Sequence, residues 1–142
     1  MAITKDEIIE LMNQFHDVVM KEKGDGKAQA KFFFHPEPRI IILHGTDLSM
    51  QRNYEIHQNL EDEIHVPCKD WLITPLCDQP ERARCVGAVY WQARQKGSTK
   101  LLKCVVGEDW IVQRIETGEL KIVMYINSYH HFLPDSSSID LK

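Results

Sequence analysis

One stretch, residues 101–133, reads LLKCVVGEDWIVQRIETGELKIVMYINSYHHFL and predicts two long strands joined by a tight turn. The turn falls at residues 116–119, where Gly118 is the kind of residue that ends one strand and begins the next. The second strand, residues 120–132, contains neither Pro nor Gly. These features predict a long hairpin that forms the spine of a curved sheet.

An amphipathic helix is predicted at the N-terminus. Thr4 and Glu7 form a T-x-x-E capping box, so the helix is expected to begin at about Thr4 and to end near residues 24–26. His16 falls at the border of the apolar stripe, which favours a place at the surface and leaves the rim of a pocket as the alternative. Asp17 falls opposite the stripe and is expected in solvent. The stripe consists of Ile8, Leu11, Met12, Phe15, Val18 and Val19.

The middle of the chain predicts shorter elements. A short helix begins at Lys27, and a β-branched strand covers residues 39–44. A second amphipathic helix is expected from Thr46 or Asp47 to about Glu63. Strands are then expected at 66–76 and 82–95. This order predicts an α+β domain over residues 1–133, with helices gathered on one face of an antiparallel sheet, followed by a polar tail at 134–142.

Composition restricts the class of protein. The 142 residues are 43% hydrophobic and 27% charged, which is typical of a globular domain. The net charge of −4 and the scattered basic residues argue against nucleic acid as a partner. No apolar run suits a membrane span or a signal peptide, so a cytoplasmic location is expected. The cysteines lack CxxC spacing and are expected to be reduced core residues, namely Cys68, Cys77, Cys85 and Cys104.

The hairpin and the element order resemble the nuclear transport factor 2-like superfamily. The resemblance covers residues 3–133 and is most specific in Trp110-x-Val112-x-Arg114, the turn with Gly118, and Leu120-Lys121-Ile122-Val123-x-Tyr125-x-Asn127-Ser128. SnoaL-like cyclases, ketosteroid isomerases and the association domain of calmodulin-dependent kinases belong to this superfamily. Leu120 departs from the pattern, because the family often has Trp there.

The resemblance implies a cystatin-like α+β cone. In such a cone a curved mixed, mostly antiparallel sheet wraps around the N-terminal helix and leaves a pocket open at one end. The resemblance also implies a homodimer formed through the outer sheet faces. It implies no single activity, because the superfamily includes isomerases, dehydratases, cyclases, epoxide hydrolases and plain binding modules.

Glu37 and His44 are the candidate catalytic residues. Glu37 lies where enzymatic relatives often carry a catalytic carboxylate, and apolar neighbours at 32–34 would raise its pKa. The alternative is that residues 35–38, with two prolines, form an exposed rigid turn. His44 ends a predicted strand and could act as a base, or it could be a hydrogen-bonded core residue.

Further residues are candidates for binding a ligand, although aromatic residues in a sheet often fill the core or an interface instead. Period-two spacing places Arg114 on one face with Trp110 and Val112. Facing inward, Arg114 would need a carboxylate from Glu37 or from a ligand; facing outward, it would form a surface or interface ion pair. The same spacing groups Asn127 with Tyr125 and Tyr129, where Asn127 could orient a ligand or tie down the strand. The ligand-binding candidates are His35, Tyr54, His57, Trp71, Tyr90, Trp110, Arg114, Tyr125 and Asn127.

Two functional hypotheses follow. The first is a SnoaL-like protein that binds a small apolar molecule, with cofactor-independent acid/base catalysis of the isomerase, dehydratase or cyclase type. The second is a non-catalytic dimeric module with an incidental cavity. No helix carries a His pair at i, i+4 spacing, so no metal site is expected, and no cofactor is expected either.

Overall fold

The structure is a computed structural model that describes residues 2–76 and 79–137. The helical segments are α1 (Lys5–His16), the π-helical turn η1 (Asp17–Lys21), α2 (Gly26–Ala30), the 3₁₀ turn η2 (Leu43–Gly45) and α3 (Met50–His57). The strands are β1 (Arg39–Ile42), β2 (Thr46–Ser49), β3 (Leu60–Pro67), β4 (Leu72–Leu76), β5 (Gln79–Gln95), β6 (Leu101–Arg114) and β7 (Leu120–Phe132).

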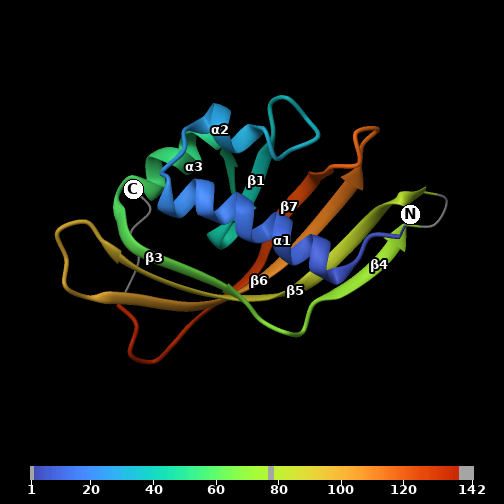
Figure 1. The fold of residues 1–142 in the computed structure, drawn as a ribbon. Coiled ribbons are helices and arrows are strands. Elements are labelled where there is room, and N and C mark those ends of the chain that lie inside the picture. The colour runs from blue at the N-terminus through green and yellow to red at the C-terminus, as the bar shows by residue number, and fades with distance from the viewer. Residues whose placement is uncertain (1, 77–78, 138–142) are drawn as a thin grey trace.

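One seven-stranded sheet forms the body of the molecule, and α1 runs across its concave face (Figure 1). The strand order is β2-β1-β7-β6-β5-β3, and β4 also pairs with β5. Strands β1 and β7 are parallel and the other pairs are antiparallel. Helices α2 and α3 lie beside one end of α1. The predicted α+β class, with a curved and mostly antiparallel sheet around the N-terminal helix, is confirmed.

The predicted hairpin is the pair β6 and β7. Its register runs from Cys104 opposite Phe132 to Arg114 opposite Leu120. Gly118 sits in the turn with φ +90°, a backbone conformation that side-chain-bearing residues rarely adopt. Trp110 and Val112 are fully buried on the concave face of the sheet.

A bulge in β7 changes which side chains face inward. Gly107 pairs with Tyr129, but the next residue of β6, Glu108, pairs with Asn127, so Ser128 is an extra residue in β7. The inward set therefore passes from Asn127 to His130, and Tyr129 is 51% exposed. The prediction that Tyr129 shares a face with Asn127 is wrong, because strict alternation does not survive a bulge.

Helix α1 begins as predicted. The Thr4 hydroxyl accepts a hydrogen bond from the Glu7 amide at 3.2 Å, and the Glu7 carboxylate accepts one from the Thr4 amide at 2.9 Å. The apolar stripe faces the sheet, where the Phe15 ring meets Trp110 edge to face at 6.3 Å. His16 is only 4% exposed, so it is a buried residue and the surface placement is wrong. The helix then widens into η1, a kind of distortion that is frequent at functional sites.

The helix predicted from Thr46 to about Glu63 is wrong at both ends. Residues 46–49 form β2, and α3 begins only after Ser49, whose hydroxyl caps it by accepting a hydrogen bond from the Arg52 amide at 3.1 Å. The helix ends at His57, and β3 already begins at Leu60. The single strand predicted at 66–76 is also wrong, because β3 ends at Pro67 and β4 begins at Leu72.

Three cysteines, Cys68, Cys85 and Cys104, are free thiols as predicted, whereas Cys77 lies outside the described residues. The described start of the C-terminal tail is held against β6, because the Ser137 amide donates to the Leu101 carbonyl at 2.9 Å. Across residues 2–76 and 79–137, the helices are too short or too polar to cross a membrane.

Candidate functional site

A cavity of about 100 Å³ lies between α1, η1, α3 and the concave face of the sheet. Most of its lining is apolar, with Phe15 and Val19 on the helical side and Val89 and Val106 on the sheet. Ligand sites in proteins commonly combine such walls with a few polar groups that converge on the ligand. The polar lining consists of His16, Asn53, His57, His65, Glu108, Tyr125, Asn127 and His130.

Two histidine rings stack at the inner wall of the cavity. His16 of α1 and His65 of β3 have ring centroids 3.4 Å apart and planes inclined by 19°. Burial, together with the neighbouring His65 ring, lowers the pKa of His16 to about 3. Burial likewise lowers the pKa of His65 to about 3. Both rings are therefore neutral near pH 7, and neither nitrogen of His65 has a hydrogen-bond partner.

Beside this stack, a carboxyl group and a hydroxyl group form a short chain of contacts. The Tyr125 hydroxyl oxygen lies within hydrogen-bond distance of two groups, Glu108 Oε2 at 2.8 Å and His16 Nε2 at 3.2 Å. Glu108 is 2% exposed, and its other oxygen, Oε1, has no partner. Burial raises the pKa of Glu108, since the apolar surroundings disfavour the charged form. Glu108 is thus a candidate for a protonated carboxylic acid that faces a ligand site.

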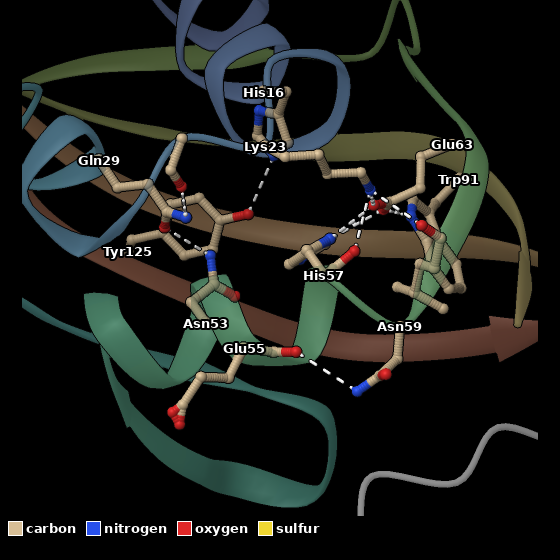
Figure 2. A network of polar contacts seen from close by, with 12 residues as sticks. His16, Lys23, Gln29, Asn53, Glu55, His57, Asn59, Glu63, Trp91 and Tyr125 are labelled. Carbon is tan, nitrogen blue, oxygen red and sulfur yellow. Dashed lines mark hydrogen bonds and ion pairs between the residues drawn. The ribbon is translucent and has the colours of Figure 1, made fainter. Parts of the chain in front are cut away.

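A second buried carboxylate, Glu63, contacts the ring of His57 (Figure 2). Both oxygens of Glu63 are within 2.9 Å of His57 Nδ1, and Glu63 also accepts hydrogen bonds from Lys23 Nζ at 2.9 Å and Trp91 Nε1 at 3.0 Å. Burial alone would raise the pKa of Glu63, but His57 and Lys23 outweigh it and lower that pKa to about 2. Glu63 is therefore ionised and holds His57 by its Nδ1 atom.

Lys23 links Glu63 to the C-terminal end of α3. Its Nζ also donates to the carbonyls of His57 and Leu60 at 2.9 and 3.0 Å, which caps the C-terminal end of α3. Its backbone has φ +53°, an uncommon conformation for a residue with a side chain. Strain of this kind persists only where surrounding contacts hold it, and it is frequent near functional sites.

His16, His65 and Glu108 are also the kind of residues that bind metal ions. One ligand atom of each lies within 4.8 Å of the others, and His16 Nε2 is 4.0 Å from Glu108 Oε2. Around a tetrahedral zinc ion with bonds of about 2.0–2.1 Å, ligand atoms lie about 3.3 Å apart. Stacked rings also direct their lone pairs side by side rather than toward one point. The geometry does not fit tetrahedral metal coordination. His16 and Glu108 instead both contact the Tyr125 hydroxyl.

Three of the predicted ligand-binding residues line the cavity, namely His57, Tyr125 and Asn127. The Oδ1 atom of Asn127 is buried without a partner, and its Nδ2 atom lies 3.5 Å from His130 Nε2. His57 comes from α3 and the other two from β7, so the fold brings together residues that are far apart in the sequence.

The other predicted site residues lie outside this lining. Glu37 and His35 are exposed in the turn before β1, where His35 Nδ1 accepts a hydrogen bond from the Glu37 amide at 3.0 Å. The two prolines thus form the exposed rigid turn that was the alternative for Glu37. His44 falls in η2, and its side chain lies outside the described part of the chain. Tyr54 is half-buried on α3 away from the lining.

The predicted aromatic residues Trp71, Tyr90 and Trp110 lie outside the cavity lining and contact other parts of the protein. Trp71 covers Gly87, where an added Cβ atom would lie 2.4 Å from the ring. Tyr90 donates its hydroxyl to Gln92 at 2.9 Å. Trp110 is buried beneath the cavity, with its ring centroid 4.8 Å from that of Tyr125.

Arg114 lies at the end of β6, away from the cavity. Its guanidinium pairs with Glu7 at 3.0 Å and with Glu81 at 3.2 Å. The first of these pairs fastens the start of α1 to the sheet. The carboxylate that Arg114 needed is therefore supplied by Glu7 and Glu81 rather than by Glu37 or a ligand.

The sequence interpretation missed two central residues, His65 and Glu108. For His16 it favoured the surface over the pocket rim, and the residue belongs to the cavity lining. Period-two spacing from Trp110 places Glu108 on the same face, so its inward direction was available from the sequence. The direction of the His65 side chain depends on where β3 begins. The helix was predicted to run to about Glu63, so the start of β3 at Leu60 was not recognised. The stacking of His16 on His65 joins α1 to β3, and local sequence patterns carry no signal for such a pair.

Neither a known protein family nor a curated protein sequence matches this chain. Solved structures do match its fold. An NTF2-like protein from Cytophaga hutchinsonii is 10% identical with a TM-score of 0.65, over 92% of this chain and 99% of the other. A hexachlorocyclohexane dehydrochlorinase, LinA-type3, from Novosphingobium barchaimii is 10% identical with a TM-score of 0.65, over 96% and 94%.

A candidate aromatic ring hydroxylase from Novosphingobium aromaticivorans is 16% identical with a TM-score of 0.67, over 90% of this chain and 92% of the other. These likenesses establish the architecture. The chain has the nuclear transport factor 2-like fold, as the hairpin and the element order predicted.

Proposed function

We propose that the protein binds a small, largely apolar molecule with a carbonyl group in this cavity and catalyses proton transfer on it without a cofactor. The observation that carries this proposal is the contrast between two buried carboxyl groups, Glu108 and Glu63. Burial raises the pKa of Glu108, whereas His57 and Lys23 lower the pKa of Glu63. Pairs of titratable groups whose surroundings drive their pKa values apart are typical of acid/base sites.

Glu108 is the proposed general acid. Its Oε1 atom has no partner, and the residue belongs to the cavity lining. A protonated carboxyl group in this position could donate a hydrogen bond to a ligand carbonyl and then transfer its proton as negative charge develops on that oxygen.

His57 is the proposed general base. Glu63 accepts the Nδ1 proton of His57, so in the neutral imidazole the lone pair lies on Nε2. Lys23 Nζ also pairs with Glu63 at 2.9 Å, so the carboxylate that orients His57 is itself held in place. His65 is a weaker choice, because a pKa of about 3 makes it a poor base near pH 7.

Together these residues suit proton removal next to a carbonyl, with protonation of the carbonyl oxygen. Isomerisations and eliminations both begin with such a step. The similar structure named as a dehydrochlorinase supports an enzymatic use of this fold but not a shared substrate, because only 10% of its residues are identical.

Binding is tested by thermal shift with small cyclic ketones, with benzoate as a charged control. We expect ketones to raise the melting temperature of the protein. Val106→Phe, which fills the cavity, should abolish this shift. Val105→Phe is the matched control, because the neighbouring side chain belongs to the opposite face of β6, and it should keep the shift. A lack of stabilisation by every ketone would contradict the binding proposal.

Catalysis is tested by incorporation of deuterium next to the ketone carbonyl in D₂O, followed by NMR. We expect His57→Gln and Glu108→Gln each to slow the enzyme-dependent exchange by about 100-fold or more, a typical contribution of general acid/base catalysis. Glu55→Gln, an exposed change on the same helix as His57, should leave exchange unaffected. Binding without any exchange would contradict the acid/base part of the proposal.

The second candidate function is a dimeric assembly module. Ile64 and Val66 are 45% and 51% exposed on the face of β3 opposite His65, and apolar patches often mark interfaces. A homodimer through the outer sheet face is therefore also proposed. Sedimentation of Val66→Glu should show a monomer where the unmodified chain forms a dimer, and a monomeric unmodified chain would rule this proposal out.

A further inference from the structure

We propose that Tyr125 is a proton relay between Glu108 and His16, which switches Glu108 between acid and carboxylate forms without changing the total charge of the site. The proposal deepens the proposed function, on which its role in turnover rests. The relay itself depends only on the three side chains and can be tested without a ligand.

The first argument is the number of protons available to the three groups. Tyr125 has one hydroxyl proton but two neighbours within hydrogen-bond distance, Glu108 Oε2 at 2.8 Å and His16 Nε2 at 3.2 Å. The hydroxyl can donate to only one of them at a time. The other contact is a hydrogen bond only if that neighbour carries the second proton.

The second argument is the fixed tautomer of His16. Its Nδ1 atom lies 2.9 Å from the carbonyl oxygen of Met12, which can only accept a hydrogen bond. Nδ1 therefore carries a proton, and in the neutral ring Nε2 is the free acceptor that faces Tyr125. His16 can take one more proton, and only from the side of Tyr125.

Two arrangements of the same two protons satisfy every contact. In the neutral arrangement, Glu108 donates its Oε2 proton to the Tyr125 oxygen, and Tyr125 donates to His16 Nε2. In the charged arrangement, the Glu108 proton has moved to Tyr125 while the former Tyr125 proton has moved to His16. Two O–H bonds have broken, and one O–H bond and one N–H bond have formed. Glu108 is then a carboxylate and His16 an imidazolium ion.

The surroundings isolate this pair of protons from solvent. Glu108, His16 and Tyr125 are 2%, 4% and 6% exposed, so water does not reach the chain of contacts freely. The other groups that act on its charge are His65 on β3, His57 on α3 and His130 on β7. Burial lowers the pKa of His16 and raises the pKa of Glu108, which favours the neutral arrangement in the empty site.

The relay gives Glu108 two roles in turnover. As an acid, Glu108 can donate to a ligand carbonyl once its proton lies on Oε1, with Tyr125 then donating to Oε2. In the charged arrangement it can accept from a ligand hydroxyl. After Glu108 has given its Oε1 proton away, one proton remains on the chain of contacts and lies between Tyr125 and the carboxylate. Glu108 is then protonated again only by a proton taken from the ligand.

The test is residue-specific NMR of the ligand-free protein, with ¹³C in the glutamate carboxyl groups and ¹⁵N in the histidine rings. As pH rises and Glu108 loses its proton, Tyr125 must turn its hydroxyl toward Glu108. We expect the ¹⁵N signal of His16 Nε2 to shift at the same midpoint as the Glu108 carboxyl signal. In Tyr125→Phe this response of His16 should be lost while Glu108 still titrates.

Tyr129→Phe is the matched control, because Tyr129 lies on the same strand but points outward, and it should keep the response. If Tyr125→Phe does not fold, Glu108→Gln replaces it, and the high-pH shift of His16 should then disappear. An unmoved His16 signal in the unmodified protein, or an equal response in Tyr125→Phe, would overturn the relay. Failure of the proposed function would instead appear as missing ketone binding or exchange, with the NMR response intact.

Discussion

His16 and His65 stack face to face, with ring centroids 3.4 Å apart, although they come from the first helix and the third strand. Two imidazolium ions could not occupy these positions without strong repulsion, because little water reaches them to screen their charge. The stack therefore holds together as a pair of neutral rings. Its stability should depend on pH.

Replacing His65 should make the protein less sensitive to acid. Both rings have a pKa of about 3 in the folded protein and an ordinary value near 6.5 when unfolded. Below pH 6.5 the unfolded chain thus binds more protons, and each ring contributes stability that is lost as pH falls from 6.5 toward 3. Wild type should therefore lose about 2 kcal/mol more free energy of unfolding than His65→Gln when the pH is lowered from 7 to 5.

Urea unfolding at the two pH values measures this difference, and the opposite contribution of Glu108 cancels because it is present in both proteins. The exposed residue His131 provides the control, since His131→Gln should follow wild type at both pH values. A constant difference between His65→Gln and wild type would show that His65 is not held neutral.

The two buried carboxyl groups should respond differently to replacement by an amide. Glu63→Gln leaves Lys23 with an unbalanced charge and disturbs the hydrogen bonds of His57 and Trp91, so it should lower the free energy of unfolding by about 3–5 kcal/mol. Glu108→Gln should change it by less than about 1 kcal/mol, because a protonated carboxyl group and an amide are both neutral. Urea unfolding at pH 7 compares them, and equal losses would contradict the assigned charge states.

Gly107 should tolerate no side chain while Tyr129 covers it. A Cβ atom at this position would lie 2.2 Å from the Tyr129 ring. Gly107→Ala should therefore lower the free energy of unfolding by about 1–3 kcal/mol through overpacking. The same change in a Tyr129→Ala background should have a smaller effect, and thermal unfolding of the two single variants and the double variant tests this coupling. Additive effects would show that the ring is not the obstacle.

Arg114 should matter for stability and not for ligand binding. Arg114→Gln removes the ion pairs with Glu7 and Glu81, so it should lower the free energy of unfolding by about 1 kcal/mol. The stabilisation by ketones should be unchanged, because Arg114 lies outside the cavity lining. Loss of the ketone shift at unchanged stability would instead restore Arg114 as a ligand-binding residue.

Local signals in the sequence predicted the first helix and the closing hairpin, whereas the curved sheet around that helix came from the family resemblance. The capping box at Thr4 and the turn at Gly118 each depend on neighbouring residues, and both were predicted correctly. The end of α3 was not, because Lys23 caps it from a distant part of the chain. The predicted helix was therefore too long, and Glu63 was assigned to it instead of to β3.

The candidate site was predicted only in part, for the same physical reason. His57, Tyr125 and Asn127 were recognised by residue type and by the face of the helix or strand that carries them, but their partners come from other elements. The opposite pKa shifts of Glu63 and Glu108 arise from burial and from charges that only the folded chain brings near. The homodimer and the cytoplasmic location stay predictions.

The bulge at Ser128 decides which side chains of β7 beyond it face the cavity. If Ser128 instead paired with Gly107 in a regular ladder, every side chain beyond it would exchange inside for outside. The side chains of His130 and Phe132 would leave the cavity, and those of Tyr129 and His131 would replace them. A change in strand pairing alone would thus give the cavity a different set of polar groups, with the composition of the chain unchanged.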